Sequence, residues 1–143
     1  MAIWHGEISL ERLNSFNKNN LGEHLGIEFT AFGDDYLKAK MPVDHRTTQP
    51  AGLLDGGSSV ALAERLGSIG GWMCVDLEKY MCVGLEINAN HIRAVREGYV
   101  EGIAKPLHIG RRTHVWEIRI QTPEGKLVCA SRITLQVVEK TAI

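Results

Sequence analysis

One stretch of this chain has the residue spacing of a helix, and the segments around it alternate in the manner of strands. In residues 58–69, apolar side chains recur every three or four positions in two rows that share Leu66. Two rows that share a residue make one broad apolar face, which needs a large covering surface. Gly70 and Gly71 follow directly, and glycines are typical of a helix end. We therefore expect a single central helix that stops at this glycine pair.

The covering surface is predicted to be an antiparallel sheet of about five to six strands. Trp116, Ile118 and Ile120 alternate with polar residues, as expected of a strand with one wet face. The segments that read as strands are two within residues 27–42, around a turn at 33–35, and four more at 79–91, 98–108, 114–122 and 126–138. We expect the last four to form a meander. A sheet curved around one helix buries both, so the predicted fold class is α+β.

The bulk properties favour one domain, residues 1–143, without a strongly charged partner. The net charge is −1 and charges of both signs are interspersed, which argues against nucleic acid and against an anionic membrane surface. No apolar run approaches the ~18 residues of a membrane span, and the N-terminus does not resemble a signal peptide. The chain is expected to open with a short helix that Ser9 caps, with Leu10 and Leu13 facing inward.

Three cysteines, Cys74, Cys82 and Cys129, give an odd number without CxxC spacing. This pattern is typical of free buried thiols in a reducing compartment, and a metal or redox role is the alternative. Together with the absence of a secretion signal, it predicts a soluble cytoplasmic protein. No HExxH motif or clustered Cys/His spacing indicates a metal site.

A candidate site surrounds a second glycine pair, at the start of the predicted helix. Gly56 and Gly57 allow a ligand to approach the backbone, and the free amides of a helix start favour an oxyanion or a polarised carbonyl. Glu64 lies two turns further along, and Ser68 follows on the same face. Gln49, in the preceding loop, can supply a second donor.

Each of these residues also has a structural interpretation. Glu64 suits a surface carboxylate paired with Arg65 or Lys105, and the glycine pair suits a plain junction between loop and helix. Ser68 suits a helical serine bonded to its own backbone. Taken alone, the residues indicate an α+β domain in which an anion or carbonyl site competes with these structural interpretations.

Several stretches together resemble one family. The run QPAGLLDGGSSVALAERLGS, with MPVDHRTTQP, VGLEINANHIR, REGYV and KPLHIGRR, resembles the hotdog-fold acyl-CoA thioesterases that use a glutamate on the helix. Members of this branch serve menaquinone synthesis and the proofreading of enterobactin synthesis. The likeness covers nearly the whole chain. It implies a hotdog fold and hydrolysis of acyl-CoA, with an aromatic acyl group, without a cofactor; an acyl carrier protein is the alternative carrier.

The resemblance also implies roles for individual residues. Glu64 attacks the thioester carbon or activates a water, Gln49 and the Gly56 amide hold the thioester oxygen, and Ser68 places the water or the substrate. The acyl-CoA site takes further residues from two segments, with arginines suited to the phosphates of the nucleotide end. These residues are Gly84, His91, Ile92, Arg93 and Ala94, and then His108, Ile109, Gly110, Arg111, Arg112 and Thr113. For His91 and for the arginine pair, a core or interface histidine and a solvated turn are the alternatives.

Members of the family pair their protomers so that two chains build each site, usually as a dimer of dimers. The resemblance therefore implies a homo-oligomer, a homotetramer in its full form. The absence of a GxSxG elbow and of a plausible Ser/His/Asp triad agrees with a glutamate-based reaction.

Asp55 departs from the family pattern, in which a histidine ordinarily precedes the glycine pair. An aspartate caps a helix well, by ~1 kcal/mol over a poor cap. A carboxylate about 6 Å from a developing oxyanion costs roughly 3 kcal/mol at an effective dielectric constant near 20. We therefore expect a well-folded protein with reduced thioesterase activity. A role for Asp55 as an additional base is the alternative.

Two other functions compete with hydrolysis. A hotdog domain can bind acyl-CoA without turnover, as a sensor or scaffold, and Asp55 favours that hypothesis while Glu64 and Gln49 oppose it. A hotdog dehydratase needs an Asp/His pair in a hydratase-type segment, which this chain lacks.

Overall fold

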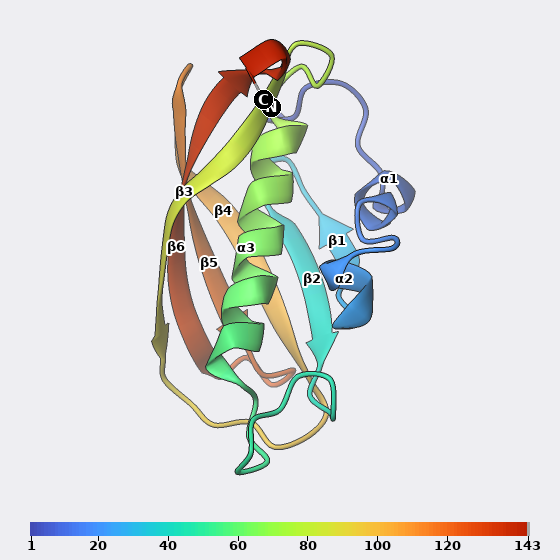
Figure 1. Cartoon of the computed structure of the whole chain (residues 1–143), viewed down its shortest axis with the longest axis vertical. Helices are drawn as coiled ribbons and strands as arrows, with labels where there is room; N and C mark the ends of the chain where they lie inside the picture. Colours follow the sequence, from blue (N-terminus) through green and yellow to red (C-terminus); the bar gives the residue numbers. More distant parts are fainter. Residues whose placement is uncertain (143) are drawn as a thin grey trace.

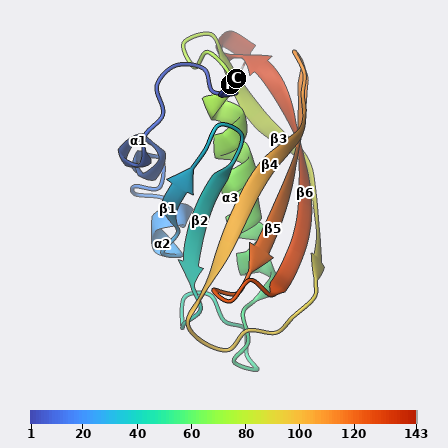
Figure 2. The same cartoon turned by 180° about the vertical axis from the view of Figure 1, so that it is seen from behind.

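The computed structural model describes residues 1–142, which contain one sheet and one long helix (Figure 1). Six antiparallel strands follow the order β1-β2-β4-β5-β6-β3, and the long helix, α3, packs against one face of the sheet (Figures 1 and 2). This is the predicted α+β arrangement of a sheet around one central helix. The helices are α1 (Leu10–Ser15), α2 (Leu21–His24) and α3 (Gly56–Met73), with a 3-10 turn η1 (Lys140–Ala142). The strands are β1 (Glu28–Phe32), β2 (Leu37–Pro42), β3 (Tyr80–His91), β4 (Tyr99–Ile109), β5 (Thr113–Gln121) and β6 (Leu127–Glu139).

The order of the last four strands differs from the predicted meander. Strands β4, β5 and β6 are successive neighbours, but β3 pairs with β6 and not with β4. Residues 92–98 carry the chain across the end of the sheet, so β4 takes the place beside β2 (Figure 1). Alternation predicts a strand and the face it buries, but it does not say which strand becomes its neighbour. As a result, β3 forms one edge of the sheet and β1 forms the other.

Helix α3 is longer than predicted at both ends. It begins at Gly56, and it continues through Gly70 and Gly71 to a length of 18 residues. The prediction that Gly70 and Gly71 end the helix is wrong, because these two glycines serve close packing instead. A side-chain carbon at Gly70 would lie 2.8 Å from the Trp116 ring, and one at Gly71 would lie 2.6 Å from a methyl carbon of Leu135.

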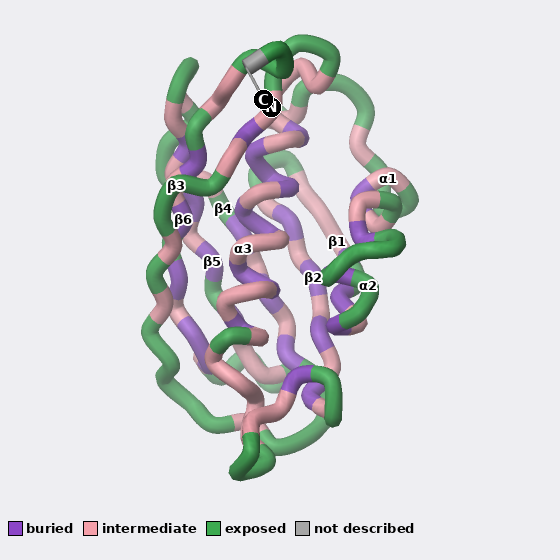
Figure 3. Tube along the Cα trace, in the orientation of Figure 1, coloured by how far each residue is buried: buried purple, intermediate pink, exposed green. Residues whose placement is uncertain are grey.

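Most buried apolar residues lie on α3 and on the strands that it packs against, and Figure 3 marks their positions along the chain. Trp116, Ile118 and Ile120 are fully buried, as their alternation predicts. On α1, Leu13 is fully buried but Leu10 is 37 % exposed, so the prediction that both face inward is wrong for Leu10. Side chains lean toward the N-terminus of their helix, and that of the first helical residue therefore leans away from the packed turn.

The three cysteines are free thiols, as predicted; Cys82 and Cys129 are buried, as predicted, but Cys74 is only half-buried. Burial raises the pKa of Cys74 to about 12 and that of Cys82 to about 11. Both therefore stay protonated near neutral pH, where a thiol is a weak nucleophile and a weak metal ligand. Within residues 1–142, no three His, Cys, Asp or Glu side chains form a group that could hold a metal ion.

None of the helices in this described part is long and apolar enough to cross a bilayer.

The close packing of α3 can be tested at Gly67. A side-chain carbon there would lie 2.5 Å from Cγ2 of Ile133. Overpacking costs about 1–3 kcal/mol, and the better helix propensity of alanine returns at most about 1 kcal/mol. We expect Gly67→Ala to lower the free energy of unfolding by up to about 2 kcal/mol. Urea denaturation measures this change.

The variant Ile133→Ala is the matched partner, because it removes the methyl group that the new side chain meets. The double variant should be more stable than the sum of the two single changes by about 0.5 kcal/mol or more. A stabilising Gly67→Ala, or strict additivity, contradicts the close contact.

Candidate functional site

The first turn of α3 leaves one backbone amide free. Asp55 is the N-cap, and its side-chain Oδ1 accepts a hydrogen bond of 2.6 Å from the amide of Gly57. The amides of Ser58 and Ser59 donate to the carbonyl oxygen of Asp55, at 3.0 and 3.2 Å. Within residues 1–142 the amide of Gly56 donates to no protein group. This amide lies at the positive end of the helix dipole and is available to a ligand oxygen.

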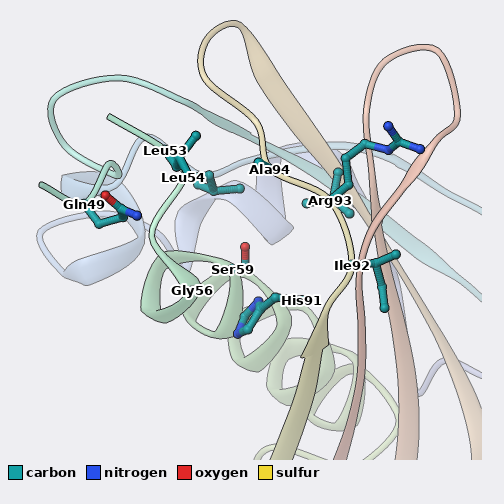
Figure 4. Close-up of a pocket in the computed structure, with 10 residues that line it drawn as sticks. Gln49, Leu53, Leu54, Gly56, Ser59, His91, Ile92, Arg93 and Ala94 are labelled. Carbon is teal, nitrogen blue, oxygen red and sulfur yellow. The ribbon is translucent and has the colours of Figure 1, made fainter. Parts of the chain in front are cut away.

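A cavity of about 340 Å³ opens beside this amide (Figure 4). Its walls combine the loop before α3, the first turn of α3, the end of β3 and the start of β6. Four of the ten lining residues, Gln49, Ser59, His91 and Arg93, carry polar side chains, and the remaining wall is mostly aliphatic. The lining residues are Gln49, Leu53, Leu54, Gly56, Ser59, His91, Ile92, Arg93, Ala94 and Val128.

Gln49 is held in a tight turn that presents its amide group to the cavity. The carbonyl oxygen of Gln49 accepts from Gly52 at 2.9 Å, and its amide donates to Leu53 at 2.8 Å. The side-chain Oε1 accepts a hydrogen bond from the amide of Ala51. Because the oxygen is engaged, the side-chain NH₂ group remains to donate to a ligand. The role of this group as a donor to the thioester oxygen stays a prediction.

The ring of His91 lies against the first residue of α3. An ideal Cβ at Gly56 would be 2.9 Å from Nε2 and 3.1 Å from Cε1 of the imidazole. Glycine is therefore needed at this position if the ring is to stay where it is. Figure 4 shows the imidazole beside the turn that carries Gly56 and Ser59. The structure thus brings residues 91–94 and Gly56 to one cavity, and their part in an acyl-CoA site stays a prediction.

Glu64 lies outside this cavity, two turns further along α3. It is half-buried, and it accepts a hydrogen bond of 3.2 Å from the Ser68 hydroxyl at Oε2. A side-chain carbon at Gly84 would be 3.4 and 3.5 Å from the two carboxylate oxygens, so the missing side chain makes room for them against β3. In the described part of the chain, Glu64 forms no ion pair with Arg65 or Lys105.

Residues 108–113 lie at the opposite end of the sheet from the start of α3 (Figure 1). Arg111 and Arg112 border a separate recess with Tyr80. Gly110 makes the turn possible, since a side-chain carbon there would lie 2.6 Å from the His108 ring. The predicted site residues thus form three groups within one chain. One lines the cavity at the helix start, and one is Glu64 with Ser68 and Gly84 at mid-helix. The third is the turn of residues 108–113, named here the arginine turn.

Four cavity residues were not among the predicted site residues. Ser59 is 2 % exposed and lies three residues after Gly56, so helical spacing alone places it on the same face. Leu53, Leu54 and Val128 carry no local signal, because their part in the wall depends on how the loop and β6 come together in space.

The comparisons with known proteins agree with this fold. Residues 51–129 match the thioesterase superfamily. The 1,4-dihydroxy-2-naphthoyl-CoA hydrolase of Escherichia coli is 53 % identical over 92 % of this chain and 96 % of that protein. The proofreading thioesterase EntH of Cronobacter turicensis is 50 % identical over 94 % of this chain and 98 % of its own length.

A solved structure is equally similar. The crystal structure of a mutant thioesterase from Pseudomonas aeruginosa superposes with a TM-score of 0.94 at 51 % sequence identity, over 96 % of this chain and 99 % of that one. This chain belongs to the thioesterase superfamily. As a member of that superfamily with relatives named thioesterase and hydrolase at about this identity, it is a thioester hydrolase. The predicted hotdog fold is confirmed.

Asp55 is the residue of this thioesterase at which the family resemblance leads us to expect a histidine. Its carboxylate caps α3, as predicted, and it is half-buried beside the free amide of Gly56. A fixed negative charge next to an oxyanion site opposes the charge that develops on the thioester oxygen. Good capping and slow chemistry are therefore expected from the same side chain.

We expect Asp55→His to raise kcat/KM for an aryl-CoA at least roughly tenfold, because the change removes the opposing charge and adds a donor. The same change should lower the free energy of unfolding by about 1 kcal/mol through loss of the cap. Steady-state kinetics and urea denaturation of the same preparation measure both effects.

Asp55→Asn is the matched control, because asparagine caps a helix as well as aspartate but carries no charge. It should keep the wild-type stability and raise kcat/KM by a smaller factor. A fall in kcat/KM in both variants would contradict the opposing charge and would support Asp55 as an additional base.

Proposed function

We propose that this protein hydrolyses aromatic acyl-CoA thioesters to the free acid and CoA. The observation that carries the proposal is the cavity where the free amide of Gly56 and the side-chain amide of Gln49 face one small volume. Two donors that converge in this way suit a thioester oxygen, on which negative charge develops during attack. The relative named 1,4-dihydroxy-2-naphthoyl-CoA hydrolase supports an aromatic acyl group. A place in menaquinone synthesis is what the family resemblance implies.

Glu64 carries the attack in this proposal. Its carboxylate adds to the thioester carbon, or it takes a proton from a water that adds there, and the carbon–oxygen double bond opens to a tetrahedral oxyanion. Collapse of the oxyanion breaks the carbon–sulfur bond and expels the CoA thiolate, which then takes up a proton. An acyl-enzyme anhydride, where it forms, is hydrolysed by water. These groups and water balance the reaction, so the proposal needs no metal or cofactor.

One chain alone keeps Glu64 away from the two donors. Eight residues of α3 separate it from Gly56, which amounts to about 12 Å along the helix. We infer that two protomers build each site, with the free edge of β3 as the contact between them. Strand β3 pairs on one side with β6, and Leu85 on it is 59 % exposed. Antiparallel pairing of two β3 edges would bring the partner's Glu64 toward this chain's Gly56.

The same pairing accounts for the distant arginine turn. Tyr80 begins β3 and His91 ends it, so antiparallel edges place the Tyr80 end of one chain beside the His91 end of the other. Arg111 and Arg112 border a recess with Tyr80. They would therefore face the partner's cavity, where guanidinium groups suit the phosphates of the CoA nucleotide. A dimer of dimers and a cytoplasmic location stay predictions from the sequence.

A protein that mainly binds acyl-CoA and hydrolyses it only very slowly is the second, non-catalytic candidate, and an acyl carrier protein is an alternative carrier. Asp55 is the observation that favours the non-catalytic candidate, because its charge opposes the oxyanion. The carboxylate of Glu64 opposes it, since this half-buried acid forms no ion pair within residues 1–142 and is free to react.

The direct test is a screen of aryl, short-chain and long-chain acyl-CoAs, followed by release of the free thiol. We expect aryl-CoAs such as benzoyl-CoA to give the highest kcat/KM and Glu64→Gln to lower kcat by about 10³-fold or more. Phosphopantetheine thioesters of acyl carrier protein form a parallel arm that measures the preferred carrier. Binding of benzoyl-CoA without thiol release would establish the non-catalytic candidate.

The two-chain site has its own test by mixing inactive variants. Glu64→Ala and Gln49→Ala lose activity separately, but a mixed dimer keeps one site with both groups intact. After denaturation and joint refolding, activity should return to roughly one quarter of the wild-type value, as expected for random pairing in a two-fold dimer. A mixture that stays inactive, although mass spectrometry detects mixed dimers, would place both groups of each site in one chain.

A further inference from the structure

His91 contacts the one residue in the first turn of α3 whose amide is free. The Nε2–Cε1 edge of its ring faces Gly56, at 2.9 and 3.1 Å from an ideal Cβ position there. The sheet fixes this position: His91 is the last residue of β3 and pairs with Cys129 of β6. The next amide, of Ile92, donates to the carbonyl oxygen of Val128 at 2.7 Å. The backbone that carries the imidazole thus belongs to the end of the sheet and not to a free loop.

The same ring edge can reach a ligand oxygen at the Gly56 amide. A Cα–Cβ bond is about 1.5 Å long, so Nε2 lies within about 4.5 Å of the Gly56 Cα. Hydrogen bonds of about 2.9 Å from Nε2–H and from the amide can therefore meet at one oxygen atom. Both residues line the cavity, so this oxygen would lie at its polar end.

The side chain before the glycine pair offers no donor at this point. A carboxylate accepts hydrogen bonds, and one of the Asp55 oxygens is engaged by the amide of Gly57. The family resemblance places a histidine there, so this chain lacks an imidazole on the helix side of the cavity. The imidazole of His91, on the strand side of the cavity, lies against Gly56.

We propose that His91 is a hydrogen-bond donor to the thioester oxygen and takes the place that Asp55 leaves without a donor. This assignment rests on the proposed function of the cavity. The Nε2–H bond stays intact throughout: His91 stabilises the oxyanion together with the Gly56 amide and transfers no proton. A donor of this kind acts more strongly on the developing charge than on the ground-state carbonyl, so its loss lowers kcat and leaves KM nearly unchanged.

Kinetics of benzoyl-CoA hydrolysis test the assignment. We expect His91→Ala to lower kcat about 100-fold with little change in KM, and His91→Gln, which keeps an N–H donor, to recover part of the loss. In the Asp55→His background the cost of His91→Ala should fall below about tenfold, because a second imidazole then serves the oxygen. A rise in KM with kcat unchanged, or an equal loss in both backgrounds, would overturn the assignment.

The carbonyl stretch of bound phenacyl-CoA gives a readout that needs no turnover. In this ketone a methylene group separates the carbonyl from sulfur, so it is not hydrolysed. Binding to wild type should lower the stretching frequency, and His91→Ala should move it back toward the value in water, whereas Glu64→Gln should not. An unchanged frequency in His91→Ala overturns the assignment even where hydrolysis fails, so the two failures are distinguishable.

The exposed His24 on α2 provides the matched control, as His24→Ala should leave kcat and the carbonyl frequency at wild-type values. Equal melting temperatures of His91→Ala and wild type would show that the strand end stays folded.

Discussion

The close approach of α3 to the sheet is the constraint on which the rest of the structure depends. Glycines replace larger side chains at the points of closest contact, and the facing groups are the bulky side chains Trp116, Ile133 and Leu135. Because the helix lies so near the strands, its first turn meets the end of β3 and its middle meets Gly84. The same packing that buries the core therefore positions both functional regions of the helix.

Local sequence patterns predict most of the elements and few of their relations. The alternation of Trp116, Ile118 and Ile120 identifies β5 and the face that it buries, because a strand's pattern reflects its immediate surroundings. The place of β3 beside β6 is set by the crossover of residues 92–98, and no local pattern encodes it. The glycines of α3 mislead for a similar reason: a glycine that ends a helix and one that lets a helix approach a sheet look alike in a sequence.

For the functional site, too, the sequence predicts the residues but not how they are arranged in space. The resemblance to hotdog thioesterases names Gln49, Gly56 and Glu64, and the spacing of α3 correctly places Ser68 next to Glu64. Neither shows that Glu64 faces Gly84 while Gln49 and Gly56 face a separate cavity. Distances between groups on different elements arise from packing, and packing is visible only in three dimensions. Asp55 is the exception: capping is a local interaction, so the sequence alone predicts that Asp55 caps α3.

The pairing of β3 with β6 has a consequence for how the protein matures during synthesis. Strand β3 has its sheet partner in residues 127–139, near the end of the described chain. Contacts between segments so far apart in sequence form late, and a chain that is still being translated lacks them. We therefore expect Gly84 and His91 to take their places only after β6 has left the ribosome. Until then, α3 would expose its apolar faces, and the nascent chain would be at its most vulnerable to aggregation.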